Sequence, residues 1–327
     1  RNILKKMNVK VLCTTDDPCD SLEYHDKIIK DGFEIKVLPT FRPDRALGAE
    51  NPIMFKEWIK KLETLLNISI RSFADLLEAL KLRADFFNSK GCRVADHGFT
   101  NILPCKISLS TMRRLFNRLS RAMPLSLEEI NVWKFGLLLE LGRIYAEKDW
   151  AWMLHSGVLR NVNSRMFSSI GPDTGFDIMA NSVSIEGLVL LFDTLNKEQR
   201  LPKTILFNLN PSDSEAFITL LGAFQEGPLF NKMQYGPAWW FLDRKEKIES
   251  HLESLSGLGL LGGFVGMVTD SRSFLSFCRH EYFRRILCNW LGFGIEKKIF
   301  PDDFELMSTL VKNISFTNAS TWFNFNF

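Results

Sequence analysis

The sequence of 327 residues lacks the features of several protein classes. It has no run of about 18 apolar residues, so it predicts no membrane-spanning helix. Lysine and arginine number 41 and aspartate and glutamate 38, an excess too small to indicate a nucleic-acid or membrane partner. The apolar fraction of 46% and the charged fraction of 24% are those of a globular protein, which excludes global disorder.

Motifs of common nucleotide and metal sites are also missing. No Gly-x-Gly-x-x-Gly or P-loop motif follows a strand-like segment, which weakens the case for a nucleotide-binding sheet. The six cysteines form no Cys-x-x-Cys pair, and we expect free thiols in a reducing compartment, hence a cytoplasmic protein. Five well-separated histidines give no His-x-His pair, so a metal site within these residues is incomplete.

Seven short apolar segments alternate with longer segments of helical period. They are rich in Val, Ile, Leu, Phe and Met without strict polar alternation, as strands covered on both faces are. The predicted strands are Val9–Thr14, Glu34–Pro39, Cys92–His97, Ala151–His155, Thr204–Asn208, Lys232–Tyr235 and Phe264–Asp270. This alternation predicts an α/β fold, either an open doubly wound sheet or a (β/α)8 barrel.

We favour a TIM-type (β/α)8 barrel that lacks its first strand. Seven strands are one fewer than a barrel requires, and the chain begins with Arg1 and runs at once into a strand-like segment. No Pro-, Gly- or Ser-rich linker divides the chain, so residues 1–327 are predicted to form one domain with strands two to eight and extra helices. The first and last predicted strands would then be open edges.

Local patterns in the helical segments give three further predictions. Ser126 followed by Glu129 indicates a capping box at a helix start. The long helical segment 51–88 is expected to break near Asn67. His25 and His251 lie in polar helices and are expected to face solvent.

Ionisable residues gather where the predicted strands end. In a barrel these ends form the active site, and a charge there needs a partner, a metal or a chemical role. The set comprises Arg42, Asp44, Asp96, His97, His155, Arg160, Asp270 and Arg272, with Thr15, Asp16 and Asp17 after the first strand. If the arginines of this set meet at one mouth, they suit a carboxylate or phosphate group of an anionic substrate.

Two members of this set also have ordinary structural interpretations. Asp270 and Arg272 are two residues apart and would project from one face if their strand extends that far. They can equally form a structural ion pair at a strand end. His155 is either a catalytic group or a core histidine bonded to a backbone carbonyl.

Several motifs resemble those of the uronate isomerase (glucuronate isomerase) family, which belongs to the amidohydrolase-like barrels. They occur in the same order and cover nearly the whole chain. They are TTDDP at 14–18, LEYH at 22–25, LPTFRPD at 38–44, ADHG at 95–98, HSGVLRN at 155–161, GPDTGFD at 171–177, MVTDSRSFLS at 267–276 and RHEYFRR at 279–285.

The resemblance implies a distorted (β/α)8 barrel with one divalent metal, often zinc, and interconversion of D-glucuronate with D-fructuronate and of D-galacturonate with D-tagaturonate. By motif, Asp270 is the last-strand metal ligand and proton carrier. The other residues implied by motif are Arg42, Asp96, His155, Arg160 and Arg272. The family's His-x-His metal ligands and an active-site tyrosine are absent from these residues, so we expect a weakly held metal and weak activity.

The sequence is therefore interpreted as an aldose–ketose isomerase that acts on a small hexuronate. A proton leaves carbon 2 and returns at carbon 1 through an enediolate. Asp270 would carry the proton, and His155 and Asp96 would handle hydroxyl protons. The arginines Arg42, Arg160 and Arg272 would hold the carboxylate and the enediolate charge.

Two alternatives remain beside the isomerase. The first is a metal-dependent hydrolase on the same barrel, in which a metal-bound hydroxide attacks the substrate. The second is a non-catalytic truncated remnant. We expect no nucleic-acid or membrane partner, and the sequence leaves a homo-oligomer open.

Overall fold

The computed structural model describes residues 1–181 and 183–325 and divides into two compact units. The N-terminal unit contains Val11–Met153 and Ser184–Lys203. The C-terminal unit contains Arg1–Lys10, Leu154–Val183 and Thr204–Phe327. The predicted single domain, residues 1–327, includes positions 182, 326 and 327, which lie outside the described residues. That domain assignment stays a prediction.

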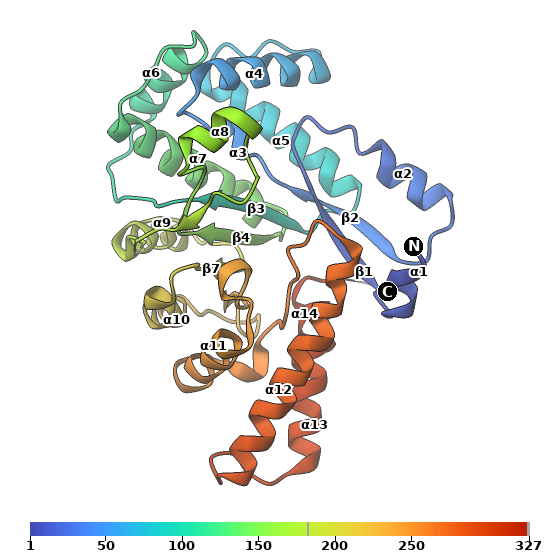
Figure 1. The fold of residues 1–327 in the computed structure, drawn as a ribbon. Coiled ribbons are helices and arrows are strands. Elements are labelled where there is room, and N and C mark those ends of the chain that lie inside the picture. Colours follow the sequence, from blue (N-terminus) through green and yellow to red (C-terminus); the bar gives the residue numbers. More distant parts are fainter. Residues whose placement is uncertain (182, 326–327) are drawn as a thin grey trace. The chain divides into compact units, whose positions relative to one another are not determined.

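Parallel strands bring charged residues together at one edge of the N-terminal unit (Figure 1). The strands β1 (Val11–Asp16), β2 (Lys36–Phe41), β3 (Val94–Phe99) and β4 (Ala151–Ser156) are neighbours in this order. β1 and β2 pair in parallel from Val11 opposite Lys36 to Asp16 opposite Phe41. Because both strands end at the same level, the next residue, Arg42, donates its backbone N–H to the carbonyl of Asp16 at 2.9 Å.

Seven helices complete the N-terminal unit, and two sequence signals at their ends are confirmed. Ser126 and Glu129 form the predicted capping box, and the helical segment breaks at Asn67, whose φ is +53°. The helices are α2 (Glu23–Lys30), α3 (Asp44–Leu47), α4 (Pro52–Leu66), α5 (Phe73–Ser89), α6 (Leu109–Leu119), α7 (Leu127–Glu147) and α9 (Ile185–Lys197).

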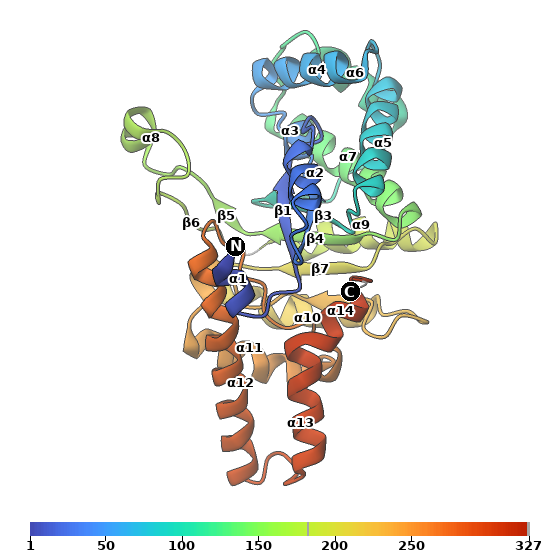
Figure 2. The ribbon, with the colours of Figure 1, turned by 90° about the vertical axis from the view of Figure 1, so that its right-hand side faces the viewer.

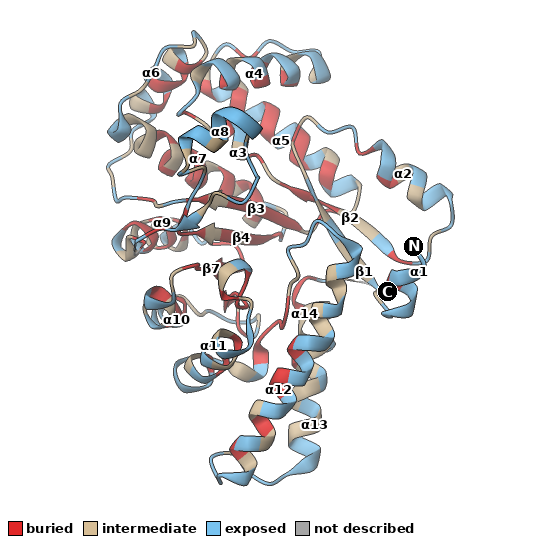
Figure 3. Cartoon of the chain, in the orientation of Figure 1, coloured by how far each residue is buried: buried red, intermediate tan, exposed pale blue. Residues whose placement is uncertain are grey.

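Aromatic side chains fill the core between these helices. The ring of Trp133 lies 5.7 Å from those of Phe55 and Phe73, in edge-to-face geometry. All three side chains are buried, and the strand β3 beside this core is buried along most of its length (Figure 3). The many phenylalanines and tryptophans of the sequence thus serve packing.

The C-terminal unit combines a short parallel ladder with a long helical region. The order of its strands is β4-β7-β8, and β7 (Thr204–Phe207) pairs in parallel with β8 (Met233–Tyr235). Its longer helices are α8 (Ser164–Ile170), α10 (Ser214–Ala223), α11 (Lys245–Leu258), α12 (Arg279–Glu296) and α13 (Phe304–Lys312); α1 (Asn2–Lys6) and α14 (Asn318–Trp322) are shorter. No helix among the described residues is both long and apolar enough to cross a membrane.

An excursion from this unit is largely exposed. β5 (Val158–Leu159) and β6 (Ile178–Met179) form a short antiparallel ladder, and α8 lies between them at the end of a loop that extends away from α11 and α12 (Figure 2). α8 has no buried residue. Its position depends on the polar contacts of the loop, because it contributes nothing to a core.

Six of the seven predicted strands are confirmed, and the seventh is wrong. Phe264–Asp270 forms no ladder in the described residues, and its backbone is interrupted by positive φ values of +78° at Gly266 and +39° at Asp270. Side-chain amides bond its backbone instead: Asn318 donates to the carbonyl of Phe264 at 2.9 Å, and Val265 donates its N–H to the amide oxygen of Gln234 at 3.4 Å. These contacts occupy groups that a neighbouring strand would otherwise bond.

Candidate active site

The guanidinium of Arg42 lies between two carboxylates in the N-terminal unit. Its Nε donates to Oδ2 of Asp44 at 2.8 Å, and its Nη1 lies 3.0 Å from Oδ2 of Asp96. The Arg42 side chain is 30% exposed, so it remains accessible to a ligand. Arg42 and Asp96 were both predicted as site residues, and they form one ion pair.

Two buried side chains stand behind Asp44. The other carboxylate oxygen of Asp44, Oδ1, lies 3.2 Å from Nδ1 of His97, and Nε2 of His97 lies 2.9 Å from the hydroxyl of Tyr145. The His97 and Tyr145 side chains are fully buried. Burial raises the pKa of Tyr145 well above its usual value, so the hydroxyl keeps its proton. These five residues, Arg42, Asp44, Asp96, His97 and Tyr145, form what we call the Arg42 network.

A glycine makes room for this network. A Cβ atom on Gly98 would lie 2.9 Å from Nη2 of Arg42, closer than a normal contact. The backbone N–H of Gly98 also donates to Oδ2 of Asp44 at 3.3 Å. Any larger residue at position 98 would therefore displace the guanidinium of Arg42.

His25 is buried, so the prediction that it faces solvent is wrong. Its Nε2 lies 2.8 Å from the hydroxyl of Thr14, which donates to Oδ2 of Asp16 at 2.7 Å. Burial raises the pKa of Asp16, and its carboxylate also accepts the backbone N–H of Thr40 at 3.3 Å. These contacts hold the end of β1 against β2, just before Arg42.

Two other predicted arginines meet at one carboxylate in the C-terminal unit. Nη1 of Arg160 lies 3.1 Å from Oδ2 of Asp177 and 3.6 Å from Oδ1 of Asp173. Nη2 of Arg272 lies 3.3 Å from the same oxygen of Asp173. The side chains of Arg160 and Arg272 are 44% and 80% exposed. We call these four residues the Arg160 cluster.

Aromatic rings fix the plane of His155. Its imidazole stacks on Phe207 with ring centroids 4.2 Å apart and an interplanar angle of 11°. The ring of Trp239 meets it edge to face at 4.6 Å. Since imidazole held in this way keeps one orientation, His155 is suited to align a substrate or a proton.

Asp270 does not occupy the end of a strand. It is exposed, and its backbone has a φ of +39°, in the left-handed region. The expectation that Asp270 and Arg272 project from one face of a strand is wrong, because Phe264–Asp270 forms no ladder. Arg272 instead pairs with Asp173.

The described residues do not by themselves fit a resident metal. Within 1–181 and 183–325, no group of three or more His, Cys, Asp or Glu side chains is placed to hold an ion. Asp270 is the only ligand that the motif resemblance assigned to these residues. The residues present are therefore insufficient for the divalent metal that the resemblance implies.

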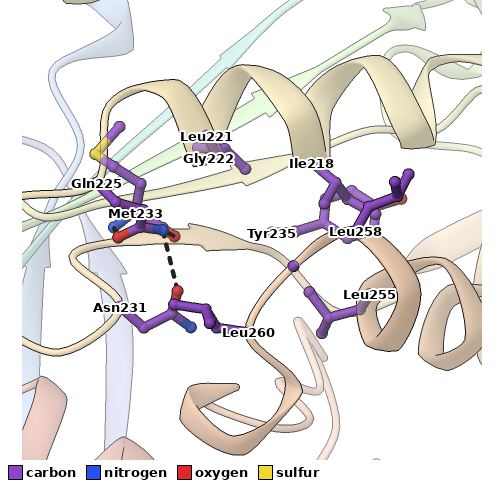
Figure 4. Close-up of a pocket in the computed structure, with 11 residues that line it drawn as sticks. Ile218, Leu221, Gly222, Gln225, Asn231, Met233, Tyr235, Leu255, Leu258 and Leu260 are labelled. Atoms are coloured by element: carbon purple, nitrogen blue, oxygen red, sulfur yellow. Dashed lines mark hydrogen bonds between the residues drawn. The ribbon is translucent and has the colours of Figure 1, made fainter.

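A cavity of about 220 Å³ in the C-terminal unit contains none of the predicted site residues (Figure 4). It lies where α10 and α11 face β8 and is lined mainly by apolar side chains, among them Ile218, Leu221, Met233 and Leu255. The amide of Gln225 at its rim donates to Asn231. Tyr235 also lines it, and its hydroxyl donates to Asn208, so these polar side chains of the lining are already hydrogen-bonded.

Sequence reasoning missed three contributors to these sites, Tyr145, Asp173 and Asp177. Tyr145 lies in the apolar helix α7, where a tyrosine is expected to serve core packing. A buried tyrosine hydroxyl needs a hydrogen-bond partner, and this requirement was the signal that could have identified Tyr145. Asp173 and Asp177 were quoted only as part of a motif. Because the predicted active site lies at the strand ends, we expect Arg42, Asp96, His155 and Asp270 to line one pocket. These residues belong to both units, and this expectation stays a prediction.

Comparison with known proteins gives a consistent result over nearly the whole chain. A family described as glucuronate isomerase matches residues 1–323. The uronate isomerase of Caldanaerobacter subterraneus is 48% identical over 323 residues, which cover 98% of this chain and 69% of that protein. The uronate isomerase of Phocaeicola vulgatus is 44% identical over 326 residues, which cover 99% of this chain and 70% of that protein.

Solved structures agree with these matches. The uronate isomerase of Thermotoga maritima superimposes with a TM-score of 0.91 at 32% identity, covering 98% of this chain and 69% of that one. The glucuronate isomerase of Caulobacter crescentus gives a TM-score of 0.89 at 24% identity, covering 99% and 66%, and shows the fold alone. The predicted α/β barrel class is confirmed by these likenesses.

Proposed function

Because this chain belongs to the glucuronate isomerase family, we propose that it interconverts D-glucuronate with D-fructuronate and D-galacturonate with D-tagaturonate. The observation that carries this proposal is the family match over residues 1–323. The substrate is a small hexuronate, and the protein acts in the cytoplasm without a nucleic-acid or membrane partner. No observation favours a hydrolase on the same barrel.

The reaction moves hydrogen within one molecule and needs no external oxidant. A base takes the proton from carbon 2 of the open-chain aldose, and the electron pair forms an enediolate with carbon 1. The proton then returns to carbon 1, while the hydroxyl proton of carbon 2 is transferred to the oxygen of carbon 1, which becomes a hydroxyl as the ketone forms at carbon 2. Such a step requires a base, donors for the oxyanion and a holder for the distal carboxylate.

We assign the proton-handling roles to three residues. Asp270 carries the proton between carbon 2 and carbon 1, and its exposure leaves it able to meet a substrate. Asp96 handles a hydroxyl proton, because its carboxylate is held beside the guanidinium of Arg42, at 3.0 Å from Nη1. His155, held flat by Phe207, aligns a hydroxyl group.

The arginines divide between two tasks. Arg160 and Arg272 bind the substrate carboxylate, because both guanidiniums are exposed and their two positive charges are balanced by only two carboxylates. Arg42 faces two carboxylates of its own, so its surroundings carry an excess of negative charge. It is better suited to a sugar oxygen than to an anionic carboxylate.

Asp270 is also proposed as this chain's ligand for a divalent metal, with zinc as the first ion to test. When bound, such an ion would polarise the carbonyl oxygen of the substrate. Because the described residues contain no cluster of three ligands, the roles assigned above do not depend on it.

Substrate charge tests the proposal directly. The chain is incubated with D-glucuronate, D-galacturonate or the neutral D-glucose, with and without added Zn²⁺, and ketose formation is followed by chromatography. A lost hydrogen bond between charged groups corresponds to about 1.5–3 kcal/mol, so glucose should react roughly 10- to 150-fold more slowly than the uronates. Equal turnover of glucose, or no ketose from either uronate, would contradict the proposal.

A further inference from the structure

We propose that Tyr145, His97 and Asp44 are positioning residues that hold the guanidinium of Arg42 against Asp96. The inference rests on the proposed function, in which Arg42 binds a sugar oxygen and Asp96 handles a hydroxyl proton. It adds to that function a role for side chains that lie behind the arginine. Two of them, His97 and Tyr145, are fully buried.

Hydrogen-bond chemistry fixes the direction of each contact in the Arg42 network. A carboxylate only accepts, so Nδ1 of His97 donates to Oδ1 of Asp44 at 3.2 Å. Nε2 of His97 is then the acceptor for the hydroxyl proton of Tyr145, at 2.9 Å. Both oxygens of Asp44 are thereby engaged, because Oδ2 accepts from Nε of Arg42. With a neutral imidazole protonated at Nδ1, the donors therefore converge on Asp44 without conflict, from His97 on one side and from Arg42 on the other.

The support matters because the nearest partner of Arg42, Asp44, is itself only partly buried. Arg42 has a long flexible side chain, and Asp44 is the first residue of the one-turn helix α3. Both side chains are 30% exposed, so an unsupported pair would adopt several geometries. His97 supplies a fixed point, because its ring packs against Tyr145 at 5.7 Å and against Trp152 at 6.3 Å. The buried core thus determines where a partly exposed guanidinium lies.

A purely structural role must be separated from a positioning role. Tyr235 of the C-terminal unit provides the matched control, since it is also buried and its hydroxyl donates to Oδ1 of Asn208 at 2.9 Å. Tyr145→Phe and Tyr235→Phe each remove one buried hydroxyl that is hydrogen-bonded to side chains. Their melting temperatures should therefore fall by similar amounts, and only the first should change Arg42.

A double-mutant cycle gives the kinetic test. In the wild-type background, Tyr145→Phe should lower kcat/KM for D-glucuronate by about tenfold, while in an Arg42→Ala background the same change should cost less than about twofold. Tyr235→Phe should change kcat/KM by less than about twofold in either background. An equal loss from Tyr145→Phe in both backgrounds would show that Tyr145 does not act through Arg42.

A second measurement does not require activity. In protein labelled with ¹⁵N-arginine, the Nε–H signal of Arg42 is assigned by its loss in Arg42→Lys. It should shift or broaden in Tyr145→Phe and in His97→Gln and stay in place in Tyr235→Phe. An unmoved signal in the first two variants overturns the positioning role. A wild-type chain without isomerase activity contradicts the proposed function instead, and the signal then decides the positioning role alone.

Discussion

The Arg42 network and the Arg160 cluster hold arginines in different ways. Arg42 is fixed through Asp44 to His97, a fully buried residue, so its geometry is set by the protein core. Arg160 and Arg272 meet Asp173 at distances of 3.6 and 3.3 Å, with side chains that are 44% and 80% exposed. One arginine is anchored from within, whereas the other two are exposed and share the half-exposed Asp173, although the side chain of Asp177, the second partner of Arg160, is buried.

This difference determines what an acidic partner does for its arginine. Exposed ion pairs contribute about 0–1 kcal/mol and are screened by salt, so Asp173 restrains its arginines weakly and competes with an incoming anion. Asp44 instead links Arg42 to a buried residue, so the guanidinium of Arg42 is already in its binding position before the substrate binds. Removing the carboxylate of Asp44 should therefore impair the placement of Arg42. Removing the carboxylate of Asp173 should instead improve binding of the substrate carboxylate by Arg160 and Arg272.

Buried histidines extend the comparison of the two units and give the largest expected effect. His97 faces the carboxylate of Asp44. The Nε2 atom of His251 instead lies 2.8 Å from the carbonyl of Gly236, and the ring of His251 stacks on Tyr235 with centroids 4.5 Å apart. The prediction that His251 faces solvent is wrong. Burial lowers the pKa of His251 from 6.5 to about 4.

A pH series tests this buried neutral histidine. As pH falls from 6.5 to 4, the imidazole of His251 takes up a proton in the unfolded chain but not in the folded protein. The free energy of unfolding should therefore fall by about 3 kcal/mol. His251→Gln lacks this contribution. Denaturant unfolding of both proteins at pH 7.5 and pH 4 should show their stability difference changing by about that amount. A difference independent of pH would mean that His251 titrates normally in the folded state.

Gly98→Ala sharpens the comparison from the side of the Arg42 network. The new Cβ would lie 2.9 Å from Nη2 of Arg42, which is the flexible end of a side chain and can move aside without unfolding the protein. Displacing the guanidinium should lower kcat/KM by about tenfold, the effect of losing one charged hydrogen bond of about 1.5 kcal/mol. Melting temperature should change little.

Gly257→Ala is the control for that substitution. Gly257 lies in α11, and a Cβ there would meet nothing within 4 Å. Alanine should raise stability by about 0.5–1 kcal/mol and leave the kinetics unchanged. If Gly98→Ala keeps wild-type kinetics as well, the exact placement of Arg42 is unimportant and the contrast between the two arginine groups loses its functional meaning.

Local sequence patterns predicted those features that depend on neighbouring residues. The strand end before Arg42, the break at Asn67 and the capping box at Ser126 follow from short-range rules, and the structure agrees. Asp96 was expected at the end of its strand and lies instead within β3, Val94–Phe99. Phe264–Asp270 has the composition of a strand, yet amides from Gln234 and Asn318 bond its backbone. No local pattern contains that information.

Long-range side-chain contacts explain the other differences. The bond between His97 and Tyr145 joins residues 48 positions apart, one in a strand and one in an apolar helix. His25 and His251 occupy polar helices, so their periodicity indicated solvent. Each is buried and makes a specific polar contact, with the hydroxyl of Thr14 and the carbonyl of Gly236 respectively. Predicting such burial requires knowing which elements meet.

The smallest expected effect has the opposite sign and tests the comparison most directly. Asp173→Asn removes the carboxylate shared by Arg160 and Arg272, so a substrate carboxylate no longer competes with it. KM for D-glucuronate should fall by about two- to fivefold with kcat unchanged, and the gain should shrink in high salt because exposed charges are screened. Asp193→Asn, which breaks a surface pair with Lys197 on α9, makes the same charge change elsewhere and should leave KM unaltered. Should Asp173→Asn raise KM instead, Asp173 would be orienting its arginines as Asp44 orients Arg42, and the two groups would work by the same principle.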